Sequence, residues 1–73
     1  MHTVELIGCA PDLDAEALVA LVRSYSDLSL QASIREVDRL VNGGTLALPF
    51  DSRQDARMFQ EEAEAIGVYV DGR

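Results

Sequence analysis

Four side chains near the beginning of this 73-residue chain could carry chemistry. They are an imidazole, a thiol and two carboxylates, on His2, Cys9, Asp12 and Asp14. A cysteine nucleophile needs a neighbouring base to form its thiolate, and His2 is the only histidine in the chain. Structural zinc takes four ligands at defined spacings, which these residues do not have. The sequence therefore predicts no catalytic set, no metal site and no cofactor.

Asp12 and Asp14 have a local explanation instead. They follow Pro11 and precede an apolar pattern with helical spacing, and aspartate is a preferred residue at a helix N-cap. The spacing predicts that Asp12 caps this helix and that Asp14 lies in its first turn, where the helix dipole favours negative charge. Cys9 ends an apolar run and is predicted to be a small buried strand residue.

Acidic residues dominate the charge of the chain. There are 13 acidic and 6 basic residues, the net charge is −7, and every basic residue is an arginine. Such a chain repels nucleic acid and anionic membranes, so the sequence predicts neither as a direct partner. The ordinary role of such a charge is to keep the protein soluble, and attraction to a protein partner with a basic surface is the alternative. One cysteine forms no internal disulfide, and neither a signal peptide nor a membrane span is recognisable, which predicts a cytoplasmic protein.

The order of apolar patterns predicts a single domain over residues 1–73. Dense or alternating apolar runs predict strands over residues 3–9, 45–50 and 68–70, and spacings of three and four predict helices over residues 12–26, 28–41 and 51–67. Pro49 cannot donate a hydrogen bond to a neighbouring strand, so the sequence predicts that residues 45–50 form an edge strand or that Pro49 lies at the end of a strand. The order β-α-α-β-α-β predicts an α+β two-layer sandwich, with three helices on one face of a three-stranded sheet.

Residues 28–41 allow two interpretations. As a strand, the alternation that begins at Leu28 breaks down when Glu36 falls on the apolar face. As a helix, Ser29 caps the start, Gly43 or Gly44 ends it, and the buried stripe consists of Leu30, Ile34, Val37 and Val41 with Leu40 beside them. The helix is the preferred interpretation. The strand would give a ferredoxin-like fold, β-α-β-β-α-β, as the alternative.

Two segments are similar to known families. The segment SRQDARMFQEEAEAIGVYV begins at Ser52, carries the pair Asp55 and Ala56 early, and closes at Gly67 before a final strand. In these positions it resembles the C-terminal domain of the bacterial ribosomal stalk protein, and residues 22–30 are similar to that family's junction between two helices. Residues 21–53 are similar to the second helix and following strand of the adaptor of the bacterial Clp protease. Both resemblances imply the β-α-α-β-α-β fold and a role in binding other proteins.

The functional motifs of these families are not retained. The stalk family binds its partners through a lysine-rich helical face, and this chain has no lysine. The Clp adaptor reads an N-terminal amine with an Asn-Asp-Asp run, whose place falls on residues 10–14 here. Only Asp12 or Asp14 keeps an acidic group there, and the place of the adaptor's histidine falls near Val41.

The sequence thus predicts a small non-catalytic protein–protein interaction or adaptor module, present as a monomer or a homodimer. The alternative is an acidic inhibitor or nucleic-acid mimic that binds a basic partner surface. The helix junction supplies a tyrosine and a leucine that could anchor a partner, and the acidic residues could meet its basic groups. The candidate partner-binding residues are Asp12, Asp14, Tyr25, Asp27 and Leu28.

Overall fold

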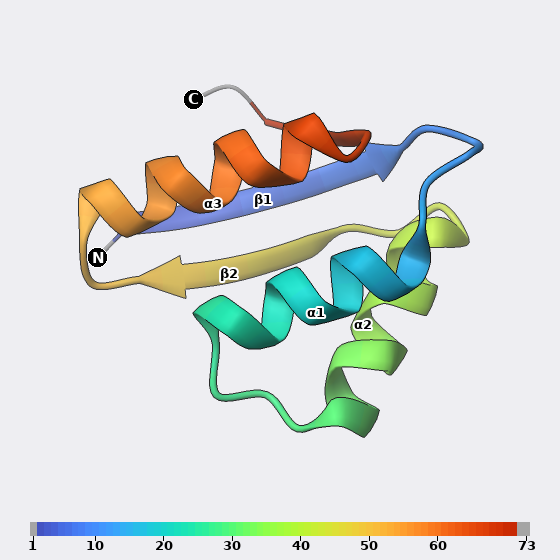
Figure 1. The fold of residues 1–73 in the computed structure, drawn as a ribbon, viewed down its shortest axis with the longest axis horizontal. Coiled ribbons are helices and arrows are strands. Elements are labelled where there is room, and N and C mark those ends of the chain that lie inside the picture. Colours follow the sequence, from blue (N-terminus) through green and yellow to red (C-terminus); the bar gives the residue numbers. More distant parts are fainter. Residues whose placement is uncertain (1, 72–73) are drawn as a thin grey trace.

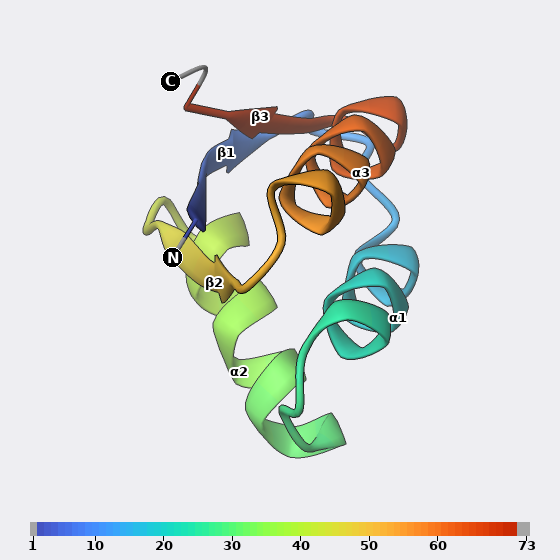
Figure 2. The same ribbon diagram turned by 90° about the vertical axis from the view of Figure 1, so that its left-hand side faces the viewer.

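The computed structural model describes residues 2–71 and has the predicted order of elements (Figure 1). Three strands form one antiparallel sheet, and three helices lie on one of its faces (Figure 2). The elements are β1 (His2–Cys9), α1 (Ala15–Tyr25), α2 (Leu30–Val41), β2 (Leu46–Phe50), α3 (Arg53–Ala65) and β3 (Val68–Val70). The α+β prediction is confirmed. The ferredoxin-like alternative is wrong, because residues 30–41 form a helix.

The sheet has β1 at its centre and β2 at one edge, in the order β2-β1-β3. Along β2, Leu46, Leu48 and Phe50 are buried beneath the helices, whereas Ala47 and Pro49 are exposed on the open face. This alternation is typical of an antiparallel sheet with one covered face. The edge position of β2 confirms what its proline predicted.

Helix α1 begins later than predicted, and the prediction that Asp12 caps it is wrong. Asp14 is the N-cap, and its carboxylate accepts hydrogen bonds from two backbone N–H groups of the first turn, at 3.1 and 3.4 Å. The N–H of Leu13 donates to the carbonyl of Ala10 (3.1 Å), which closes a turn over Pro11 and Asp12. Since proline at the second position favours such a turn, Asp12 is held outside the helix.

Helix α2 confirms the helical interpretation together with both of its ends. The hydroxyl of Ser29 accepts a hydrogen bond from the N–H of Ala32 (3.1 Å), as expected for an N-cap. After the helix, Gly43 has a φ of +98°, a conformation that side-chain-bearing residues rarely adopt. The chain therefore leaves the helix at Gly43 and turns towards β2.

The buried stripe predicted for α2 is largely wrong. Leu30, Ile34 and Val41 are 49%, 42% and 50% exposed, whereas Val37 and the adjoining Leu40 are buried as predicted. Helix α2 packs against α1, β1 and β2 simultaneously. The rotation of the helix about its own axis is therefore set by three neighbours and not by its apolar pattern alone. The face that it turns to the core consists of Ser33, Val37 and Leu40.

Ser33 is expected to reduce the stability of the protein. Its hydroxyl is fully buried and has no hydrogen-bond partner among residues 2–71. Replacing Ser33 by alanine removes this unpaired polar group and adds a better helix former, so the free energy of unfolding should rise by about 1 kcal/mol. Urea denaturation measures the change. The matched control is Ser29→Ala, which should lower the same free energy by about 1 kcal/mol because it removes the cap. A loss of stability in Ser33→Ala would contradict the prediction.

Helix α3 has Ser52 as its N-cap. The hydroxyl of Ser52 accepts hydrogen bonds from the N–H groups of Gln54 (3.1 Å) and Asp55 (3.3 Å), so Asp51 lies just before the cap. The helix is followed by Gly67 at a φ of +102°, which turns the chain into β3 as predicted.

An aromatic cluster joins α1, β2 and α3. The Phe59 ring is fully buried and lies 5.5 Å from the Tyr25 ring in an edge-to-face arrangement. The Phe50 ring packs against both, with ring centres 5.3 Å from Phe59 and 6.1 Å from Tyr25. This cluster fixes the end of α1 against the end of β2, which positions the groove described below.

Candidate protein-binding groove

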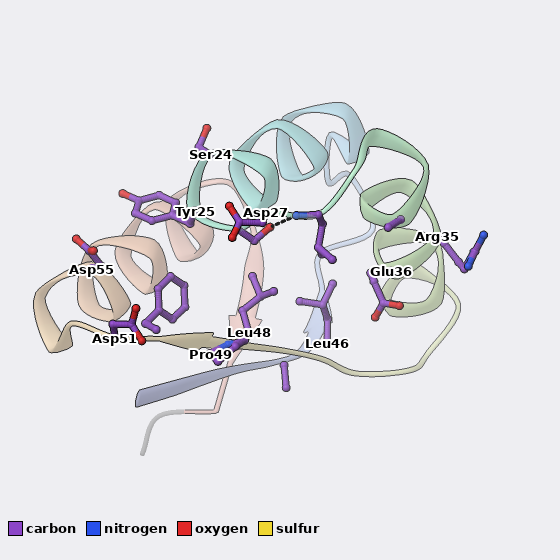
Figure 3. A pocket seen from close by; sticks show the side chains of 15 residues that line it. Ser24, Tyr25, Asp27, Arg35, Glu36, Leu46, Leu48, Pro49, Asp51 and Asp55 are labelled. Atoms are coloured by element: carbon purple, nitrogen blue, oxygen red, sulfur yellow. Dashed lines mark hydrogen bonds between the residues drawn. The ribbon is translucent and has the colours of Figure 1, made fainter. Parts of the chain in front are cut away.

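A groove of about 990 Å³ lies beside β2 (Figure 3). Its walls come from the end of α1, the α1–α2 junction, the first half of α2 and the beginning of α3. A volume of this size is at the upper end of the range for ligand pockets, which is about 300–1,000 Å³. The groove therefore offers room for a peptide segment.

The floor of the groove is apolar. It consists of the three β2 side chains that point towards the helices, together with the half-buried Leu28 from the α1–α2 junction. Such a floor contributes to binding by removing apolar surface of a partner from water.

The rim of the groove is acidic. Asp27, Asp51 and Asp55 line it, are exposed, and make no ion pair among residues 2–71. The fourth lining carboxylate, on Glu36, is 3.1 Å from the guanidinium of Arg39 and is thereby partly neutralised. Within the described part of the chain, Arg35 is the one basic residue of the lining, and Figure 3 places it at the Glu36 end, away from Asp51 and Asp55. The other end is thus the more negative one.

Tyr25 is held in place on both sides. Its ring packs edge-to-face on Phe59 and Phe50, and its hydroxyl donates a hydrogen bond to the carboxylate of Glu62 on α3. This hydrogen bond, followed by loss of hydration and by the negative charge of Glu62, raises the pKa of the Tyr25 hydroxyl above its usual value. The side chain therefore forms a fixed wall of the groove in its neutral form.

The raised pKa of Tyr25 predicts how stability changes at high pH. Because the folded state holds the hydroxyl proton more tightly than the unfolded state, the stabilisation is complete below the ordinary tyrosine pKa of about 10 and is lost as the pH rises through the higher folded pKa. Wild-type protein should lose stability more steeply above pH 10 than Tyr25→Phe does. Thermal unfolding of both proteins between pH 8 and 11 checks this, and parallel curves would contradict it.

Three of the five candidate partner-binding residues come together in this groove. Tyr25, Asp27 and Leu28 line it side by side. Asp12 and Asp14 do not line it and precede the other end of α1, which at 11 residues is about 16 Å long. The structure thus separates the acidic pair from the helix junction.

Sequence reasoning missed the part of the groove that β2 and α3 contribute. The alternation in LALPF and its proline marked an edge strand, but they did not indicate what lies beside it. The sequence places Asp51 and Asp55 near the start of the helix predicted over residues 51–67, and Asp55 does lie in the first turn of α3. Their place on the rim depends on how α3 packs against the α1–α2 junction.

The thiol and imidazole noted in the sequence are far apart. Cys9 is half-buried at the end of β1, and His2 is at its beginning, about 24 Å away along an extended strand. Within the described part of the chain, no three His, Cys, Asp or Glu side chains are placed to hold a metal ion. Among the features of residues 2–71, the groove is therefore the strongest candidate for a binding site.

Comparison with known proteins identifies no matching family model, curated protein or solved structure. The similarity to the ribosomal stalk domain and to the Clp adaptor stays a prediction. Among residues 2–71, no helix is both long enough and apolar enough to cross a membrane.

Proposed function

We propose that this protein is a small non-catalytic binding module and that the groove beside β2 receives a segment of another protein. One observation carries the proposal: an apolar floor, an acidic rim and a sheet edge that pairs with no other strand among residues 2–71 occur in the same place. Apolar contacts supply affinity, whereas the rim charges select a partner and steer its approach. The role as an adaptor, suggested by the two resemblances, belongs to the same proposal.

The apolar floor favours this proposal over the alternative of a nucleic-acid mimic. A mimic of nucleic acid needs carboxylates in the place of phosphates and has no use for a hollow lined by Leu28 and the inner side chains of β2. A protein segment uses both parts of the groove. We place this module in the cytoplasm, since its single cysteine forms no internal disulfide.

Position-specific photo-crosslinking tests the proposed function. A photoreactive benzoylphenylalanine replaces Leu28 on the floor of the groove, and separate control proteins carry it at Asp12 or at Glu64. Both control positions are exposed and lie outside the groove. Illumination in the native cell should yield an adduct with another polypeptide at position 28, at several times the yield of either control. Equal yields at the three positions would contradict the proposal. A dominant adduct at position 12 would place binding at the other end of α1 instead.

A further inference from the structure

The free edge of β2 has a defined set of unpaired backbone groups. The N–H of Asp71 donates to the carbonyl of Glu5 (2.9 Å), so the backbone groups of Glu5 face β3 and not β2. In an antiparallel pair, opposite residues alternate between those that exchange hydrogen bonds and those that do not. Glu5 and Ala47 are therefore opposite residues that do not exchange hydrogen bonds with each other. Ala47 turns its N–H and its carbonyl away from β1, towards the free edge.

Pro49 follows the same rule, because it lies two residues further along β2. Its carbonyl faces the free edge, where the missing N–H of proline costs the sheet no hydrogen bond. The edge thus offers one donor and two acceptors, from Ala47 and Pro49. These are the groups to which an added strand bonds.

More negative charge lies beside this edge than the capping of α2 and α3 requires. Ser29 caps α2, so Asp27 is not needed for that purpose and makes no hydrogen bond through its side chain among the described residues. Asp51 and Asp55 lie near the start of α3, where the helix dipole offsets about half of one charge. The helix dipole thus offsets only a small part of the charge of the three carboxylates. The part of the groove away from Arg35 is therefore strongly negative.

We propose that the groove binds an extended, basic segment of another protein, which adds to β2 as an antiparallel fourth strand. This inference rests on the proposed function and specifies the partner. Antiparallel pairing matches the existing sheet and is slightly more stable per residue than parallel pairing. Neighbouring strands lie about 4.8 Å apart, so the added strand occupies the groove itself.

The geometry also fixes which side chains of the segment enter the groove. Residues that bond to Ala47 and Pro49 lie opposite them and share their open face. The alternate residues point towards the helices, over Leu28 and Tyr25. Long basic side chains suit these positions, because their stems cover the apolar floor while their charged ends reach Asp27 on the rim.

A second copy of this chain is a poor occupant of the same edge. Each copy carries a net charge of −7 and would bring its own three rim carboxylates to the contact. Like charges placed opposite one another oppose association. The charge complementarity therefore favours a basic partner over self-association.

Peptide titrations followed by the amide signals of the protein test this inference. The probe is acetyl-Lys-Val-Lys-Val-Lys-Val-amide, whose lysines enter the groove when its valines bond to β2. Two further peptides of the same charge carry N-methyl groups, one on all valines and the other on all lysines. Methylation of the valines should weaken binding about tenfold, because it removes the N–H groups that face β2, whereas methylation of the lysines should leave binding nearly unchanged.

Charge-neutralising variants form the second arm. Asp27→Asn should weaken binding of the unmodified peptide about two- to fivefold, whereas the matched variant Asp12→Asn, outside the groove, should not. Equal effects of the two variants, equal effects of the two methylation patterns, or stronger weakening by lysine methylation would each overturn the inference. If these results occur while crosslinking at position 28 succeeds, the groove binds proteins in another manner. If crosslinking fails as well, the proposed function is wrong.

Discussion

Replacing Phe59 by alanine is expected to lower the free energy of unfolding by about 3–5 kcal/mol. The ring is fully buried and contacts Tyr25 and Phe50 edge-on or tilted, so its removal loses apolar burial, two aromatic contacts and close packing. A domain of this length has a total stability of about 4–11 kcal/mol. The variant should therefore lose a large fraction of the stability of the domain.

Met58 provides the matched control for this prediction. It is the preceding residue on α3 and is 46% exposed, so Met58→Ala should change the free energy of unfolding by less than about 0.5 kcal/mol. Circular dichroism with urea denaturation of both variants measures the difference. A cost below 2 kcal/mol for Phe59→Ala would show that the aromatic cluster does not hold α1, β2 and α3 together.

The second large effect concerns charge reversal on the rim of the groove. Combining Asp27→Arg with Asp51→Arg replaces two carboxylates by two cations, and it should weaken binding of a basic partner by about tenfold or more, because like charges then face each other. The yield of the adduct at position 28 reports the loss. Folding should be retained, since both residues are exposed and form no ion pair among residues 2–71.

The matched control reverses the same number of charges elsewhere. Glu61 and Glu64 are exposed on α3 and do not line the groove, so Glu61→Arg combined with Glu64→Arg changes the net charge equally. If both double variants reduce the adduct to the same extent, net charge attracts the partner and the rim of the groove has no special part. Adduct that survives reversal of the rim would contradict the assigned role of Asp27 and Asp51.

The fold could be predicted because its signals are local. Ser29 and Ser52 mark helix starts through hydrogen bonds to their own first turns, and Gly43 and Gly67 mark helix ends through positive φ. Even the choice of helix for residues 28–41 depended on local spacing and capping. The wrong prediction that Asp12 caps α1 also has a local cause. Asp12 belongs to the turn over Pro11, so it is not available as the N-cap.

What the sequence could not provide is the rotation of α2 and the assembly of the groove. Ile34 and Ser33 are neighbours, and only packing against α1, β1 and β2 decides that serine faces the core. The α1–α2 junction could be recognised as a candidate surface from Tyr25 and Leu28. Asp51 lies on the same rim only because of tertiary packing, which the local spacing of residues does not predict.

The most direct test of the groove as a binding site uses the partner segment itself. The segment that carries the adduct at position 28 is sequenced, made as a peptide and titrated against isotope-labelled protein. The account predicts saturable shifts of the amide signals of Asp27, Leu28 and Ala47, with the amides near Glu64 unchanged. Saturable shifts confined to α3 beyond the groove, or no saturable shift at all, would contradict it.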